Sequence, residues 1–208
     1  MQTTAKKTPP FPWLKPAIFI GSLTPVAAIL LRAVRGELGA NPISLVLNQL
    51  GLMALVFLVA ALVCTPLKTC FGWTWPLRVR RMLGLYAFLY ALLHVSTYTG
   101  VDQFFDWQAI AADVTKRQFI FVGFAAFILL IPLAVTSTNG AVKRMGYVRW
   151  KQLHRLAYVV PLLGVIHFTW RVKKDVREPM VYAIILAALL LIRVVTYIRS
   201  RVTTSVTT

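Results

Sequence analysis

Long apolar runs separated by short polar gaps dominate the chain, and this pattern predicts its elements. Six runs stand out, at about 16–34, 43–67, 82–98, 118–135, 152–170 and 179–197. A helix needs roughly 20 mostly apolar residues to cross the hydrocarbon of a bilayer, and each run is close to that length. The pattern therefore predicts an all-α integral membrane protein, a six-transmembrane-helix bundle in which residues 1–208 form a single domain.

The gaps between these runs predict the connections. The stretch 100–117 mixes three aspartates with an apolar face, which is typical of a short interfacial helix. The stretches 68–81 and 136–151 are rich in Lys and Arg and are interpreted as basic loops. No clear small-residue cleavage site follows the first apolar run, so we expect the N-terminus to be the uncleaved start of the first helix.

Composition supports the membrane interpretation and adds a strong charge. The chain is 58% hydrophobic and 14% charged, with 23 Lys and Arg against 6 Asp and Glu. A soluble protein with a net charge of +17 would suggest nucleic-acid binding. Here the basic residues cluster in the gaps, where membrane topology and anionic membrane lipid explain them, so we expect no nucleic-acid partner.

The distribution of basic residues predicts the orientation in the membrane. Six crossings place both termini on one side, and alternation assigns 15 of the 23 Lys and Arg to that side. By the positive-inside rule we expect a multi-pass protein of the bacterial inner membrane with both termini in the cytoplasm.

All three histidines lie within or beside apolar runs, between residues 78 and 171. His94 follows Arg81 by 13 residues, about 20 Å along a helix, and His167 follows Lys151 by 16 residues, about 24 Å. Both are therefore expected in the outer half of the bilayer, at comparable depth. We predict that they are the two iron ligands of one haem. The alternative is a pair of interior histidines bonded to backbone or hydroxyl groups.

His154 has a less defined role in the sequence. It lies one turn inside the run 152–170, and an ideal helix separates it from His167 by about 140°. The position 14 residues before His94 is Arg80 and not a fourth histidine. Several roles stay open for His154: a ligand of a second haem, a contact of a haem propionate, a quinone or a flavin, or interfacial placement.

Two further observations bear on cofactors. Cys64 and Cys70 fit neither a haem-attachment motif nor an iron–sulfur motif, so any haem is expected to be b-type and held non-covalently. Arg80 and Arg81 can bind haem propionates or a flavin phosphate, or can serve as topology determinants. No glycine-rich dinucleotide motif is present, so we expect electrons to arrive from a mobile carrier or a separate protein.

The run RRMLGLYAFLYALLHVSTY and the stretch LAVTSTNGAVKRMGYVRWKQLHRLAYVVPLLGVIHFTW closely resemble the MsrQ family (formerly YedZ). These are haem-binding membrane subunits of the bacterial methionine sulfoxide reductase system. The resemblance covers about residues 13–200 and extends to the wider family of ferric-reductase-like transmembrane domains. Relatives in that wider family hold two stacked haems with two histidines on each of two helices, whereas here Arg80 or Arg81 stands where the fourth histidine would fall.

The resemblance implies a function. Such subunits take electrons from the quinone pool or a cytoplasmic flavin reductase and pass them through haem b, with FMN as a further cofactor. The acceptor is a periplasmic molybdopterin-containing subunit that reduces methionine sulfoxide in oxidised proteins, so the chain is expected to carry no substrate chemistry of its own. The alternatives are a self-standing ferric or quinone reductase, and a small transporter or purely structural anchor. The transporter is disfavoured because we expect the other runs to contribute no buried acid or base.

Overall fold

The computed structural model describes residues 11–172 and 175–206, and every secondary-structure element within them is a helix. The elements are α1 (Leu14–Val34), α2 (Pro42–Phe71), η1 (Trp75–Arg78), α3 (Arg80–Ser96), η2 (Thr97–Asp102), α4 (Trp107–Lys116), α5 (Gln118–Val135), α6 (Asn139–Met145), α7 (Tyr147–Leu153), α8 (Leu156–Arg171) and α9 (Arg177–Val206). All-α architecture is therefore confirmed.

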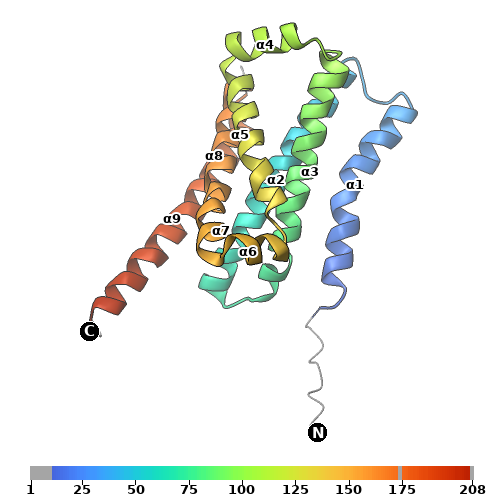
Figure 1. Cartoon of the computed structure of the whole chain (residues 1–208). Coiled ribbons are helices and arrows are strands. Elements are labelled where there is room, and N and C mark those ends of the chain that lie inside the picture. Colours follow the sequence, from blue (N-terminus) through green and yellow to red (C-terminus); the bar gives the residue numbers. More distant parts are fainter. Residues whose placement is uncertain (1–10, 173–174, 207–208) are drawn as a thin grey trace.

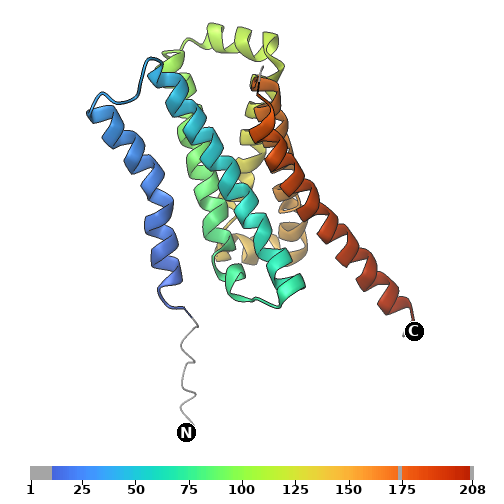
Figure 2. The ribbon, with the colours of Figure 1, turned by 180° about the vertical axis from the view of Figure 1, so that it is seen from behind.

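The long helices run up and down in one bundle (Figure 1). Helix α4 lies across one end, the α4 end, and the short helices α6 and α7 lie at the opposite end, the α6–α7 end. Asp106 caps the start of helix α4: its carboxylate accepts hydrogen bonds from the backbone N–H groups of Gln108 and Ala109, each at 3.0 Å. The short helix predicted in this gap is confirmed. Helix α1 begins, and helix α9 ends, at the α6–α7 end, as Figures 1 and 2 both show.

Five helical segments in the described residues are long and apolar enough to cross a membrane, so the chain is a multi-pass membrane protein. They comprise α1, α2, α3 together with η2, α5, and the first part of α9. The sixth predicted crossing, 152–170, differs from the expectation. Its helical part, α8, has only 16 residues, so six crossings are not confirmed.

The expected helix 152–170 is interrupted at His154 and Arg155. Helix α7 ends at Leu153, and the N–H of Arg155 bonds to the carbonyl of Gln152 in a tighter turn, at 3.1 Å. The indole N–H of Trp150 donates to the carbonyl of Thr136 at 3.0 Å, which ties α7 back to the end of α5. The stretch 136–151, expected as a basic loop, therefore contains two short helices, and His154 lies at a junction instead of inside a helix.

Buried side chains of α2 form the centre of the bundle. On one face, Leu55, Val59 and Leu62 pack against α8 and α9, and on another, Leu50 and Ala54 pack against α1 and α3. The first helix is held by α3: the hydroxyl of Tyr86 donates to the carbonyl of Phe19 at 3.2 Å, and that of Tyr90 to Ser22 at 2.7 Å. Because α2 packs against α1, α3, α8 and α9, its face toward the cavity is fixed in place.

A half-buried cation, with its Nε atom fully buried, joins the last helix to the bundle. Pro66 has no N–H, so the carbonyl of Leu62 in α2 lacks its usual helical partner. The guanidinium of Arg193 in α9 supplies one, donating to Leu62 at 2.8 Å and also to the hydroxyl of Tyr158. The expectation that the last apolar run contributes no buried base is therefore wrong at Arg193, and its two bonds explain the residue as a structural link between α2, α8 and α9.

Candidate functional site

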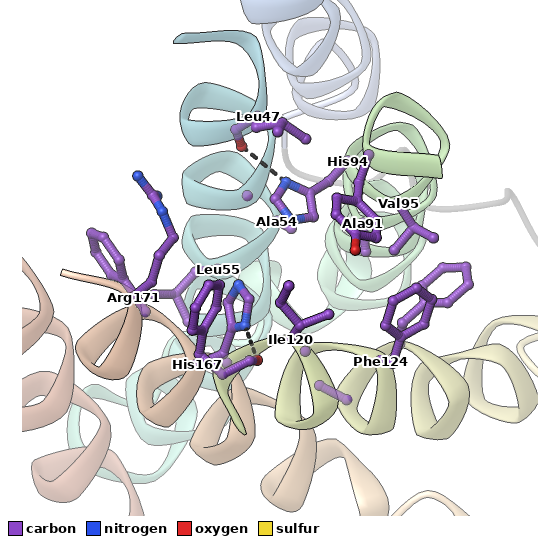
Figure 3. Close-up of a pocket in the computed structure, with 18 of the residues that line it drawn as sticks. Leu47, Ala54, Leu55, Ala91, His94, Val95, Ile120, Phe124, His167 and Arg171 are labelled. Carbon is purple, nitrogen blue, oxygen red and sulfur yellow. Dashed lines mark hydrogen bonds between the residues drawn. The ribbon is translucent and has the colours of Figure 1, made fainter. Parts of the chain in front are cut away.

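A cavity of about 270 Å³ lies between α2, α3, α5 and α8. Small residues from all four helices line it, which leaves room for a flat ligand between the helices: Gly51, Ala54, Ala91, Gly123, Ala126 and Gly164. Larger apolar side chains, including Leu58, Leu130 and Val160, close the end toward the middle of the bundle. His94 and His167 point into this cavity from α3 and α8 (Figure 3).

His94 is oriented by the neighbouring helix α2. Its Nδ1 lies 2.9 Å from the carbonyl oxygen of Leu47. A carbonyl only accepts hydrogen bonds, so Nδ1 carries the proton and Nε2 keeps its lone pair. Gly51 lies one turn further along α2, and a Cβ atom there would stand 3.2 Å from the His94 ring. Because Gly51 has no side chain, the imidazole of His94 can reach the carbonyl of Leu47 on the surface of α2.

His167 repeats this arrangement in the second half of the bundle. Its Nδ1 lies 2.6 Å from the carbonyl oxygen of Phe119 on α5, as the second dashed line of Figure 3 shows. Gly123 follows Phe119 by one turn, and a Cβ atom there would stand only 2.7 Å from the same Nδ1. Each helix pair, α2 with α3 and α5 with α8, therefore presents one imidazole in the same way, with Nε2 available as a ligand.

The two imidazoles lie close to each other across the cavity. Their ring centroids are 6.2 Å apart and their planes are nearly perpendicular, at 87°. Metal–imidazole bonds are about 2.0–2.1 Å long and a ring nitrogen lies about 1 Å from its centroid, so two imidazoles on opposite sides of one metal have centroids roughly 6 Å apart. The separation observed here fits a single metal between the rings.

The surrounding residues indicate what kind of metal centre fits. Among the described residues, no group of three or more His, Cys, Asp or Glu is placed to hold a bare metal ion. Cys64 and Cys70 are both free. Two histidines and an apolar slot suit an iron whose remaining four ligands come from a planar macrocycle, which is the haem arrangement.

The structure separates His154 from this site. Its Nε2 lies 3.0 Å from the hydroxyl oxygen of Thr136, and its ring stacks on Trp150 with the centroids 4.0 Å apart. It does not line the cavity between His94 and His167. The histidine is therefore part of the contact between α7 and α5 at the α6–α7 end.

Arg80 and Arg81, also candidates from the sequence, lie away from the cavity as well. The guanidinium of Arg80 donates to the hydroxyl of Thr65 at 3.2 Å, and that of Arg81 to the side-chain oxygen of Asn139 at 3.0 Å. Neither lines the cavity. Both remain at the α6–α7 end, where α2, α3 and α6 meet.

Two other arginines, which the sequence indicated only as topology determinants, do line the cavity. They are Arg117, just before α5, and Arg171, at the end of α8. Arg171 follows His167 by four residues, so the two share one face of a helix, and this spacing is the signal that could have identified it. No comparable sequence signal marked Gly51 or Gly123, since their role depends on how neighbouring helices are aligned.

Comparisons with known proteins show which family the chain resembles. A family model described as "Ferric reductase like transmembrane component" matches residues 48–165. The chain is 51% identical to a protein of Rhodospirillum rubrum over 89% of both chains. It is 46% identical to a protein of Herminiimonas arsenicoxydans, over 93% of this chain and 90% of that one. It is 45% identical to a protein of Deinococcus radiodurans, over 92% and 95%. All three bear the name "Protein-methionine-sulfoxide reductase heme-binding subunit MsrQ".

Proposed function

The chain belongs to the MsrQ family of haem-binding subunits, within the ferric-reductase-like transmembrane proteins, and we propose on this premise that it is a single-domain, b-type haem electron-transfer subunit. The observation that carries the proposal is the pair His94 and His167, whose ring centroids lie 6.2 Å apart with both Nδ1 atoms bonded to backbone carbonyls. When bound, the haem iron carries one electron at a time by cycling between its ferric and ferrous states.

The chain's own residues hold this centre rigidly. The carbonyls of Leu47 and Phe119 fix the tautomer and the orientation of the two imidazoles, and hydrogen bonding at Nδ1 makes Nε2 a stronger ligand. The cavity is largely apolar, with α2, α3, α5 and α8 around it, so water is kept from the ligand bonds. A rigid, shielded site suits electron transfer, because the ligands move little between the two oxidation states.

The proposed route runs across the membrane. Electrons enter at the α6–α7 end from the quinone pool or from a cytoplasmic flavin reductase. They leave at the α4 end, near which His94 and His167 lie, to a periplasmic molybdopterin-containing subunit that reduces methionine sulfoxide in proteins. The names of the relatives support the reductase system. Arg80 and Arg81 remain proposed sites for the phosphate of FMN or for a carboxylate of a second haem at the entry end.

Haem reoxidation in membrane vesicles tests this route. After the haem is reduced by a quinol or by a flavin reductase with FMN, we expect it to be reoxidised only when both the catalytic partner and a protein containing methionine sulfoxide are added. His167→Ala vesicles are the negative control. Reoxidation by a ferric chelate at the same rate, with no effect of the partner, would instead support a self-standing ferric reductase.

Charge at the two ends supports the proposed orientation. All six acidic residues of the sequence lie at the α4 end: Glu37, Asp102, Asp106, Asp113, Asp175 and Glu178. Basic residues concentrate at the other end, in η1, α6 and α7, with Arg78, Lys143, Arg144, Arg149 and Lys151. The positive-inside rule places that end, and with it both termini, in the cytoplasm.

We therefore expect a green fluorescent reporter fused at Thr208 to be fluorescent and an alkaline phosphatase fused there to be inactive. A phosphatase fused at Gly36, between α1 and α2, should show the opposite behaviour and serves as the control. Phosphatase activity at Thr208 would place the α6–α7 end outside.

We expect His154→Ala to leave the spectrum of the His94–His167 centre intact. His154 lies 13 residues before His167, which is about 20 Å along a helix axis, so it cannot bind the same iron. The stacking of His154 on Trp150 and its bond to Thr136 join α7 to α5, and this structural role accounts for the residue without a haem. Haem per protein, measured in purified wild type and variant, tests this expectation. A fractional loss of haem would indicate a second haem at His154, and loss of all haem would refute the pairing.

A further inference from the structure

Arg171 is a cation without an anion. The residue is half-buried, and its guanidinium has no hydrogen-bond acceptor and no carboxylate partner among the residues that the structure describes. A charge held partly away from water costs free energy unless something pairs with it. The position of Arg171 thus calls for a negatively charged partner that does not come from the described part of the chain.

The place of Arg171 indicates where that partner lies. It lines the cavity one helical turn beyond His167 and on the same side of α8, and Figure 3 shows both residues at this part of the cavity. Arg117 lines the same end of the cavity from the start of α5. The opposite end is closed by Leu58, Leu130 and Val160 and offers no charge. The cavity is therefore polar at the α4 end and apolar toward the middle of the bundle.

We propose that Arg171, assisted by Arg117, binds the carboxylates of the haem held between His94 and His167, so that the carboxylate edge of the haem faces the α4 end. This inference rests on the proposed function and goes beyond it, because it assigns an orientation to the cofactor and a role to two residues outside the ligand pair. Haem b carries two carboxylates on one edge and apolar substituents on the others, which matches the two ends of the cavity. A guanidinium pairs with a carboxylate through two parallel hydrogen bonds.

The two arginines are not equivalent. Arg117 is exposed and its Nε lies 3.4 Å from a carboxylate oxygen of Asp113, so part of its charge is already compensated. Arg171 has no such partner and is expected to dominate. Asp102 also lines this end and accepts a hydrogen bond from Gln103 at 2.9 Å. Because Asp113 pairs with Arg117 and Asp102 bonds to Gln103, Arg171 is the cation of this lining that is left for a carboxylate of the ligand.

A comparison of two porphyrins tests the proposal. The full chain, purified in detergent from haem-deprived cells, is titrated with haem b and with its dimethyl ester, which has no carboxylates. We expect the wild type to bind haem b at least about tenfold more tightly than the ester, as a charged hydrogen bond in a shielded site requires. Arg171→Gln should lose most of this preference, Arg117→Gln less, and Arg171→Lys should keep part of it.

The reduction potential gives a second readout. Removing a positive charge near the carboxylates favours the ferric form, and a tenfold change in that balance corresponds to a potential about 59 mV more negative for one electron in Arg171→Gln. Arg177→Gln is the matched control, since Arg177 lies at the same end but is exposed and paired with Asp175. Equal binding of both porphyrins by the wild type would overturn the proposal without affecting His94 and His167. A wild type that binds neither porphyrin would contradict the haem function itself.

Discussion

Replacing either cavity histidine by alanine is expected to remove the haem from the purified protein. His94→Ala and His167→Ala each delete one of the two proposed iron ligands, and in a cavity lined by apolar residues water is a poor substitute. Changes in residues that only support a metal ligand already weaken metal binding by about 10–100-fold, so loss of the ligand itself should cost at least about a hundredfold. Haem per protein, measured by extraction after purification, reports the effect.

Chemical rescue separates loss of a ligand from loss of the fold. His94→Gly and His167→Gly leave a space the size of an imidazole, so added imidazole should restore a six-coordinate haem spectrum in each. His154→Gly should need no rescue, because His154 lies outside the cavity. If His94→Ala and His167→Ala both retained wild-type haem content, the proposed ligand pair would be wrong.

Gly123→Ala is expected to impair the site severely, although it adds a single methyl group. Its Cβ would stand 2.7 Å from Nδ1 of His167 and 2.8 Å from Cε1, closer than atoms in proteins normally approach. The ring would have to move off the carbonyl of Phe119, to which it is bonded at 2.6 Å. Forcing an extra group into a packed site typically costs about 1–3 kcal/mol, which corresponds to roughly 5- to 150-fold weaker haem binding.

The other glycines of the long helices provide a graded control. Gly51→Ala would place its Cβ 3.2 Å from the His94 ring, a contact that a small adjustment relieves, so we expect a smaller loss. Gly84→Ala, on α3, has no atom within 4 Å and should bind haem like the wild type. Haem titration of the three variants should therefore rank them Gly123, Gly51, Gly84 from the strongest effect to the weakest. A uniform effect would mean that the glycines act through helix stability and not through the histidines.

The helices with clear polar borders could be predicted from the sequence, and the interrupted one could not. Helix α5 has the predicted limits, because Arg117 precedes its apolar run and Thr136 and Ser137 follow it. The break at His154 and Arg155 has no such local signal. It depends on bonds from Trp150 and His154 to Thr136, which lies in another segment of the chain. Local patterns do not encode contacts of that kind.

The candidate site, too, could be predicted from the sequence only in part. Depth along two helices was enough to bring His94 and His167 to one level, and the structure places their rings together. Their carbonyl partners, Leu47 and Phe119, depend on how neighbouring helices are aligned, and sequence depth does not determine alignment. Arg171 was overlooked because a basic residue at the end of an apolar run also serves as a topology signal.

The electron paramagnetic resonance spectrum of the oxidised protein tests the central claim most directly. Two imidazoles on one ferric iron give a low-spin signal, and the nearly perpendicular planes of His94 and His167, at 87°, should make that signal strongly anisotropic. We predict this signal in the wild type and in His154→Ala, and its absence in His94→Ala and His167→Ala. A high-spin signal in the wild type, or a low-spin signal that survives the loss of His94 or His167, would contradict the claim that these two residues bind one haem between them.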